Sequence, residues 1–221
     1  MTTPSTGPDP VALRLSALNA LLRFAAERYP DDYEVAIVRC RGGHDDEFDD
    51  EAAAADEELK LAYHFLFDHR LNDGQSPAEA YLQEPSHSPD SQEESVLRRL
   101  AASQLRPYEV EEVRPGGGIS LRDLWTKESL LVTERTSTPE VAPGDVLVAR
   151  VTREADDNAR LEGGVYAFEP QMKESLLEEL RGEAREFHLR HPELNEYDFF
   201  KTVAPGVIHG FWLDEVAFAS L

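Results

Sequence analysis

The sequence predicts an α+β fold, in which a small central antiparallel β-barrel or curled sheet is flanked by N-terminal and C-terminal helices. Three observations predict it. Between residues 107 and 152, short apolar runs are separated by turn residues at 115–118, 127–128 and 143–145. Short β-branched and aromatic runs about 8–12 residues apart are typical of small sheets and barrels. Longer segments on both sides carry apolar residues at helical spacing.

Residues 1–52 are predicted to hold an N-terminal helix and an acidic loop. Asp9-Pro10 is a capping residue followed by proline at the first helical position. The helix should end near Tyr29, because a residue before proline avoids the α conformation. Its expected buried face carries Val11, Leu15, Leu18, Leu22 and Ala25, widened by Leu21 and Phe24. Residues 33–40 resemble a strand, although their short apolar run also fits a helix.

The acidic loop, residues 42–51, reads GGHDDEFDDE. His44 and its neighbouring carboxylates suggest cation ligands, but their spacing does not match an EF-hand loop. Because runs of like charge are usually solvated, we expect no metal site here. The single cysteine, Cys40, excludes an intramolecular disulfide and a cysteine-based zinc site. We interpret it as a small, semi-buried side chain.

Residues 53–106 are predicted to be helical. Apolar residues nearly encircle a helix over 52–71, which indicates a buried element. Ser76-Pro77 should begin a short helix, and Asp90 or Ser91 should cap the next one.

Residues 107–169 are predicted to form the small β-barrel. In its first strand, Tyr108 and Val110 should face one way and Glu109 and Glu111 the other. The last strand is expected near 165–168, after a polar loop at 154–160. Residues 170–221 are predicted to be a C-terminal helical region packed on the rest, with a long helix from Pro170 to about 188 and an aromatic-rich end that docks.

The chain is strongly acidic. Its 221 residues include 44 Asp and Glu against 22 Lys and Arg, which gives a formal net charge of -22. This charge repels nucleic-acid phosphates and anionic membranes. Because the acidic residues are spread over every segment, we favour a solvated surface adapted to high salt over a nucleic-acid mimic. Without a signal peptide or an apolar run long enough to span a membrane, the sequence predicts a cytoplasmic protein with no membrane partner.

His64 and Asp68 are the candidate catalytic residues, with His69 adjacent. They lie four residues apart, so they project from one face of the predicted helix. They lack the second histidine and the glutamate of a zinc-protease helix motif. A histidine and an aspartate within an apolar helix are more often a satisfied polar pair. Nor do the glycines at 116–118 open a phosphate-binding loop, because no Lys-Ser/Thr and helix follow them.

Three segments, at residues 65–84, 97–132 and 142–151, resemble an uncharacterised bacterial region found in proteins that often carry a SEC-C zinc motif. The resemblance rests on Phe67-Asp68, Asp73-Gly74, the YEVEEV strand, the LRDL of 121–124 and the GDVLVAR run. The cysteine-rich SEC-C motif itself is absent, because Cys40 is the only cysteine. The resemblance implies an architecture and supplies no site residues.

The leading functional hypothesis is a non-enzymatic protein-binding or adaptor module. It presents the barrel face around Tyr108, Arg122 and Trp125 to a protein partner. Binding of single-stranded nucleic acid on the barrel aromatics also needs a positive groove, which the net charge disfavours. Its candidate cations are Arg98, Arg99, Arg106, Arg114 and Arg122.

Two alternatives remain open at this point. A metal-dependent hydrolase would use His64 and Asp68, with His69 or His44, and requires that these side chains converge in a cleft. An acidic inhibitor that mimics nucleic acid requires carboxylates spaced like phosphates along one face. The sequence favours a non-enzymatic role, with no cofactor and no metal site.

Overall fold

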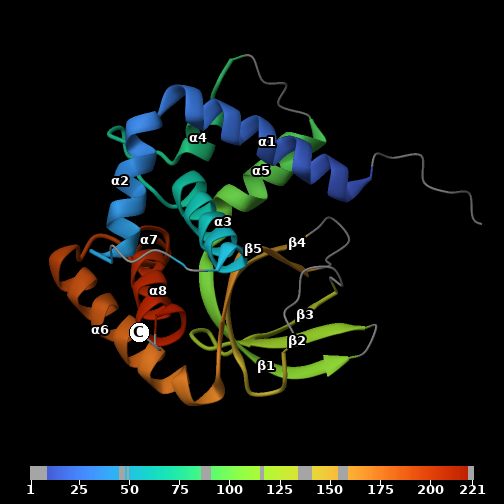
Figure 1. The fold of residues 1–221 in the computed structure, drawn as a ribbon, viewed down its shortest axis with the longest axis vertical. Helices are drawn as coiled ribbons and strands as arrows, with labels where there is room; N and C mark the ends of the chain where they lie inside the picture. Colours follow the sequence, from blue (N-terminus) through green and yellow to red (C-terminus); the bar gives the residue numbers. More distant parts are fainter. Residues whose placement is uncertain are drawn as a thin grey trace, which may run out of the picture.

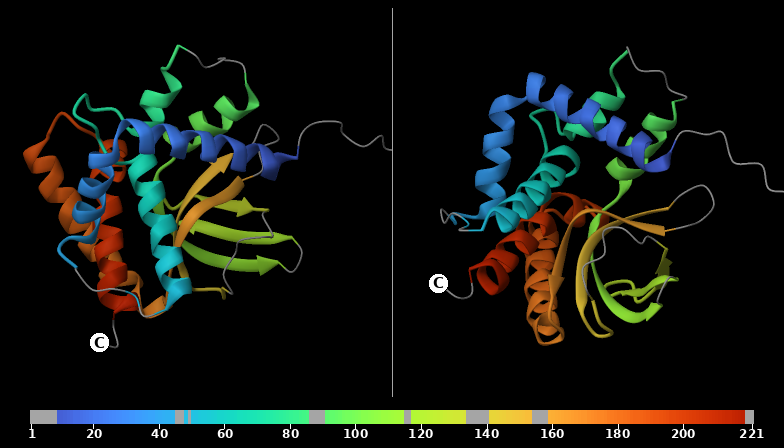
Figure 2. Two further views of the ribbon diagram at one scale, coloured as in Figure 1. Left: turned by 45° about the horizontal axis from the view of Figure 1, so that its top comes forward. Right: turned by 45° about the vertical axis from the view of Figure 1, so that its right-hand side comes forward.

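The chain is an α+β protein. The computed structural model describes residues 9–44, 48, 50–85, 91–114, 117–133, 141–153 and 159–218. In Figure 1, α1, α2, α4 and α5 lie together, the strands form a separate layer, and α6 to α8 lie beside the strands. Helix α3 runs between these three groups, and the rotated views of Figure 2 show the same arrangement. The predicted α+β class is therefore confirmed.

Helix α1 (Pro10–Arg28) has the predicted ends. The Asp9 side chain accepts a hydrogen bond from the Val11 N–H at 3.0 Å, and the helix stops one residue before Tyr29. Helix α2 (Pro30–Arg41) occupies the segment that resembles a strand, so the strand interpretation of residues 33–40 is wrong. Pro30 at the first helical position and two aspartates in the first turn favour a helix start there.

The buried face of α1 differs from the predicted one. Ala17, Leu21 and Ala25, each four residues apart, are buried. Most of the predicted stripe lies about a quarter turn away from this buried face. In it, Val11 is 52%, Leu15 56% and Leu22 41% exposed. The sequence carries apolar residues on both faces, and the face with the small alanines allows close packing on α5 and α4.

The next three helices follow the predicted signals. Helix α3 (Glu51–Phe67) ends earlier than residue 71, with Asp68 at its C-terminal cap. Helix α4 (Pro77–Leu82) begins with a capping box, in which Ser76 and Glu79 exchange side-chain hydrogen bonds with each other's backbone N–H groups. Helix α5 (Gln92–Ala102) is capped by Ser91. The other candidate cap, Asp90, lies outside the described residues.

The sheet consists of β1 (Leu105–Arg114), β2 (Gly118–Asp123), β3 (Ser129–Val132), β4 (Val146–Arg153) and β5 (Ala159–Phe168). The strands hydrogen-bond in the order β1-β2-β3-β5-β4, and β4 pairs back to β1, so the sheet closes into a ring. All pairings are antiparallel except β3 with β5, where Val132 pairs with Ala159 in parallel. The prediction of an antiparallel sheet did not include that pairing, and the last strand is longer than predicted.

Alternation along the strands is as predicted. Tyr108 and Val110 pack inside the ring, whereas Glu109 and Glu111 lie on its outer side. On β5, Gly163 and Gly164 let α3 approach the sheet closely. A Cβ on Gly163 would lie 2.5 Å from the Tyr63 ring, so any larger side chain there would displace this ring of α3.

The C-terminal helices cover the outer face of β4 and β5. They comprise a 3-10 turn (Pro170–Met172), α6 (Lys173–Arg190), α7 (Glu196–Thr202), α8 (Ala204–Trp212) and a π-helical turn, η2 (Leu213–Ala217). Phe199 and Phe200 are fully buried among strand residues such as Val148 and Phe168. The aromatic-rich end is therefore docked, as predicted. Helix α8 also packs on α2 and so joins the C-terminal helices to the N-terminal ones.

Buried apolar side chains form three clusters. One lies among α1 to α5, one inside the ring, and one between the outer face of the ring and α6 to α8. The division into 1–52, 53–106, 107–169 and 170–221 remains a prediction. In the part of the chain that the structure describes, no helix is both long and apolar enough to cross a membrane.

Candidate functional site

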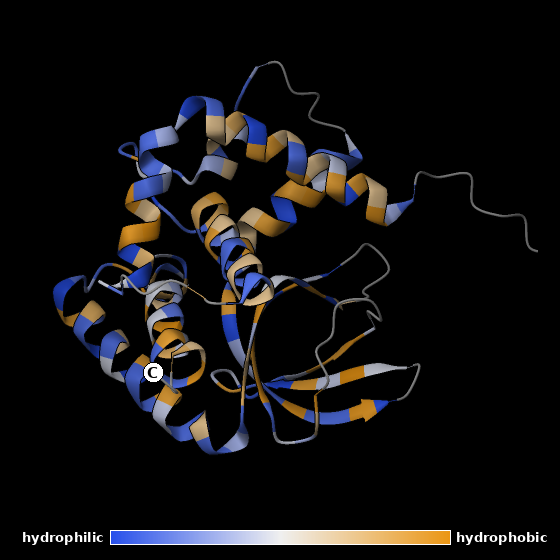
Figure 3. Cartoon of the chain, viewed as in Figure 1, coloured by the Kyte–Doolittle hydropathy of each residue, from blue (hydrophilic) through white to orange (hydrophobic). Residues whose placement is uncertain are grey.

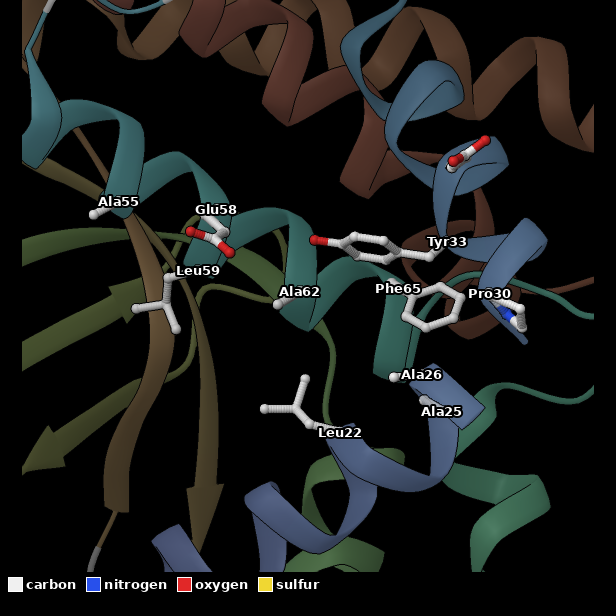
Figure 4. Close-up of a pocket in the computed structure, with 11 residues that line it drawn as sticks. Leu22, Ala25, Ala26, Pro30, Tyr33, Ala55, Glu58, Leu59, Ala62 and Phe65 are labelled. Atoms are coloured by element: carbon white, nitrogen blue, oxygen red, sulfur yellow. The ribbon is translucent and has the colours of Figure 1, made fainter. Parts of the chain in front are cut away.

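A groove opens between the C-terminal half of α1, the start of α2 and the middle of α3 (Figure 4). Its volume is about 550 Å³, within the usual range of ligand-binding clefts. In Figure 4, Leu22 points into the space from α1, and Ala62 and Leu59 line it from α3. The complete lining is Leu22, Ala25, Ala26, Pro30, Tyr33, Glu34, Ala55, Glu58, Leu59, Ala62 and Phe65.

The groove continues an apolar stripe on the outside of α1. Leu22 and Leu59 are 41% and 45% exposed within the groove, and Val11 and Leu15 extend the stripe toward the start of α1. Val11, Leu15 and Leu22 are four and seven residues apart, so they share one helix face. Figure 3 shows the hydrophobic residues spread along the whole of α1. A contiguous exposed apolar surface of this kind often marks a site of interaction with another molecule.

The charged groups that line this groove are acidic. Glu34 and Glu58 are exposed side chains, and no cation lines the groove among the described residues. Tyr33 packs edge-on against Phe65, with 5.1 Å between ring centroids. Burial, then the nearby Glu58 and Glu57, raises the pKa of the Tyr33 hydroxyl above its ordinary value. The tyrosine therefore stays protonated and offers a hydrogen-bond donor at an otherwise apolar wall.

His64 and Asp68, the candidate catalytic residues, belong to a buried ionic cluster. Asp68 is 2% exposed and pairs with Arg150 of β4. Its other oxygen lies 3.3 Å from Lys201 Nζ of α7. Lys201 also donates to the carbonyls of Ala101 and Ser103 at 2.9 and 3.0 Å, and Arg150 donates to the Ser103 carbonyl at 3.1 Å.

These contacts tie four elements together. The carbonyls of Ala101 and Ser103 terminate α5, and a helix C-terminus favours cations. Asp68 comes from the end of α3, Arg150 from β4 and Lys201 from α7. Burial lowers the pKa of Lys201 to about 8, although Asp68 opposes the shift. The geometry is that of a buried structural hub, in which Asp68 Oδ1 forms an ion pair with Lys201 but no hydrogen bond.

The space beside His64 is too small for a substrate. Its Nδ1 lies 3.9 Å from Asp68 Oδ2, beside a cavity of about 10 Å³, room for about one water molecule. Burial lowers the pKa of His64 to about 4, with Asp68 opposing, so the imidazole is neutral near pH 7. The His64 side chain is 13% exposed, and the space that it and Asp68 border is too small to serve as a cleft for a substrate.

The other candidate histidines lie elsewhere. His69 Nε2 is 3.8 Å from Asp32 Oδ1 of α2, and His44 Nε2 is 3.4 Å from Asp214 Oδ1 of η2. The structure does not bring either of them to His64. Within the described ranges, no group of three or more His, Cys, Asp or Glu side chains is arranged to hold a metal ion. Part of the acidic loop, residues 45–47 and 49, lies outside those ranges.

A second buried network, missed in the sequence, involves His209 of α8. The Tyr166 hydroxyl lies 3.1 Å from His209 Nδ1, and His209 Nε2 lies 3.3 Å from Glu57 Oε1. Glu57 also accepts a hydrogen bond from Arg41 Nε at 2.9 Å. Burial raises the pKa of Glu57, but the hydrogen bonds from His209 and Arg41 outweigh it and hold the pKa below its ordinary value. This network connects α2, α3, α8 and β5.

Tyr108, Arg122 and Trp125, the predicted binding residues, do not share one face. Tyr108 is buried inside the ring. Arg122 lies on the outer side of β2 and pairs with Glu109 across the strands. Trp125 follows β2, where its indole N–H donates to Glu196 at 2.6 Å. Because neighbouring residues on a strand point to opposite sides, a surface that includes both Tyr108 and Arg122 does not form.

Four of the five arginines considered for nucleic acid already hold carboxylates. The pairs are Arg98 with Glu94, Arg106 with Asp123, Arg114 with Glu112, and Arg122 with Glu109. Arg99 donates to Ser95 Oγ at 2.7 Å. A continuous positive track for a phosphate backbone is therefore missing from these residues.

Comparison with protein-family profiles, with curated proteins and with solved structures finds no match to this chain. The resemblance to the SEC-C-associated region stays a prediction. The site must therefore be interpreted from its own geometry, and the groove of α1, α2 and α3 is the strongest candidate.

Proposed function

We propose that this protein is a non-enzymatic binding module, and that the groove of α1, α2 and α3 binds an amphipathic helix of a partner protein. The observation that carries the proposal is the junction of this groove with the exposed stripe of Val11, Leu15 and Leu22. Helix-in-groove recognition uses apolar side chains at the same helical spacing in the partner. The adaptor role thus moves from the predicted barrel face to the helical half.

The partner helix should be basic on its polar side. Glu34 and Glu58 line the groove without a cation among its described lining residues, and the whole chain carries a net charge of -22. Complementary charge speeds association and selects against acidic partners. A lysine-bearing helix with leucines on one face meets both requirements.

The test uses a peptide with leucines along one helical face and lysines opposite, and a scrambled peptide of the same composition. Binding is measured by calorimetry at two salt concentrations. The protein should bind the amphipathic peptide more tightly than the scrambled one, and less tightly at high salt. Replacing Glu34 and Glu58 by glutamine should reduce both the affinity and its salt dependence.

Leu22→Ser removes an apolar contact without adding charge. Because binding would bury only the exposed part of the Leu22 side chain, we expect a loss of binding free energy of about 1 kcal/mol, or roughly a fivefold increase in Kd. Leu131→Ser is the matched control, because Leu131 on β3 is 40% exposed and lies outside the groove, against 41% for Leu22. Equal effects of the two substitutions, or equal binding of both peptides, would overturn the proposal.

The alternatives receive less support. A metal-dependent hydrolase would need substrate to reach His64 and Asp68, which border only a cavity of about 10 Å³. The acidic mimic and the high-salt surface both stay hypotheses about the charge of -22. If the acidity is an adaptation to salt, the melting temperature should rise between low and molar KCl as self-repulsion is screened. A flat or falling melting temperature contradicts the salt hypothesis.

A further inference from the structure

A second groove, with basic side chains in its lining, lies beside α6. It has a volume of about 630 Å³ and runs between Trp125 and the outer face of α6. Its lining is Trp125, Arg181, Ala184, Arg185, His188, Leu189 and Glu196. Arg181, Arg185 and His188 are four and seven residues along α6, so they project from one helix face.

Two of these cations lack an acidic partner. Arg181 and Arg185 are exposed, and the described part of the chain holds no carboxylate within ion-pair distance of either. They are exposed cations in a chain with two acidic residues for every basic one. Many other described arginines hold a carboxylate: Arg14, Arg28, Arg41, Arg70, Arg98, Arg106, Arg114, Arg122 and Arg150.

The acidic side chain in the groove is already occupied. Glu196 accepts from the Trp125 indole N–H at 2.6 Å and lies 3.2 Å from Arg106 Nη1. Arg106 is shared with Asp123, so the charge of Glu196 is only partly compensated from the side of the sheet. The two arginines Arg181 and Arg185 still outnumber this one carboxylate in the groove. At physiological salt, screening weakens the interaction between exposed charges that lie more than about 8 Å apart. A small ligand in the groove therefore interacts more strongly with Arg181 and Arg185 than with the distant acidic residues.

The groove also offers an apolar platform. Leu189 is 76% exposed, and the half-exposed Trp125 is held rigid by Phe199 and Phe200, with ring centroids at 6.2 and 5.1 Å. A rigid aromatic side chain beside two guanidinium groups suits a ligand that combines carboxylates with an apolar side chain.

We propose that this groove binds an acidic peptide segment of a partner protein, with an aromatic or aliphatic side chain between its carboxylates. Arg181 and Arg185 bind the carboxylates, and Trp125 and Leu189 contact the apolar side chain. A nucleic-acid strand fits less well, because it needs a track of cations and successive stacking platforms, and Trp125 is the one aromatic side chain in the described lining other than His188. With the groove of α1 to α3, the module would join a basic and an acidic segment.

The test probe is a short acetylated peptide with a phenylalanine flanked by glutamates. The controls are the same peptide with glutamines, and a single-stranded oligodeoxynucleotide. Binding to the full chain is followed by calorimetry and by the fluorescence of Trp125, the more exposed of the two tryptophans. We expect the glutamate peptide to bind at low salt and the glutamine peptide to bind at least about tenfold more weakly.

The double variant Arg181→Glu with Arg185→Glu reverses both charges and should weaken binding of the glutamate peptide about tenfold or more. Leu189 is 76% exposed, so Leu189→Ser should leave the core intact and weaken binding of the glutamate peptide severalfold. Arg23→Glu makes the same kind of charge change on α1, outside this groove, and should leave binding as in the wild type. Unchanged binding in the double variant, equal binding of both peptides, or tighter binding of the oligonucleotide would each overturn the proposal.

Discussion

Removal of the charge on Asp68 should destabilise the fold severely. In Asp68→Asn the side chain keeps its shape but no longer compensates Arg150 and Lys201, which are 2% and 0% exposed. The two cations would then have only neutral acceptors, namely the carbonyls of Ala101 and Ser103 and the asparagine amide oxygen. Buried charges without a counter-ion are among the most costly defects in a protein interior.

Two routes bracket the magnitude. Loss of one partner of a buried ion pair costs about 3–5 kcal/mol. Alternatively, Lys201 releases its proton; its pKa in the wild type is already about 8, so lowering it further to pH 7 adds about 1.4 kcal/mol at 1.36 kcal/mol per pH unit. Since whole domains are stable by roughly 5–15 kcal/mol, a loss of about 1.4–5 kcal/mol in Asp68→Asn is a sizeable part of the total.

Urea unfolding followed by circular dichroism measures this loss at pH 7. The control is Glu112→Gln, which breaks the exposed pair with Arg114 and should leave the midpoint unchanged, because exposed pairs contribute little. A loss below about 1 kcal/mol in Asp68→Asn would show that water reaches the cluster. The structural account of Asp68 would then be refuted, and the catalytic hypothesis would regain support.

Further predictions concern the packing of two glycines, the titration of His64 and the reactivity of Cys40. Gly163→Ala should lose about 1–3 kcal/mol because its Cβ meets the Tyr63 ring, whereas Gly182→Ala on α6, with open space around it, should gain about 0.5–1 kcal/mol in the same unfolding assay. The pKa of His64 is about 4 in the folded state against an ordinary 6.5, so the unfolded state binds the proton first as the pH falls. The stability of the fold should therefore decrease as the pH is lowered from about 6.5 to 4. In thermal unfolding, His64→Gln should make this dependence on pH less steep. Burial raises the pKa of the Cys40 thiol, so iodoacetamide at pH 8 should label Cys40 slowly until urea unfolds the chain.

Local signals in the sequence predicted much of the fold. The caps at Asp9, Ser76 and Ser91 mark helix starts because their side chains bond backbone N–H groups within the same turn. The alternation of Tyr108 with Glu109 predicted that they face opposite sides of β1, because the strand period is two, and the structure places Tyr108 inside the ring. Residues 33–40 were misassigned, because a short apolar run fits either structure and packing on α3 and α8 decides for the helix.

The candidate sites were harder to predict because they depend on contacts between distant segments. Asp68 meets Arg150 and Lys201 only after α3, β4 and α7 pack together. The groove of α1 to α3 had a local signal, namely more apolar residues on α1 than one buried face requires. Which face stays exposed is decided by the alanines that pack on α5, and that choice is not visible in the periodicity.

The most direct test of the central claim is to locate the bound amphipathic peptide by NMR. Amide and methyl resonances of the full chain are recorded with and without the leucine- and lysine-bearing peptide. The binding-module account predicts the largest shifts at Leu22, Leu59 and Phe65, with Leu131 unaffected. Shifts confined to the five-stranded ring, or spread evenly over the surface, would contradict it.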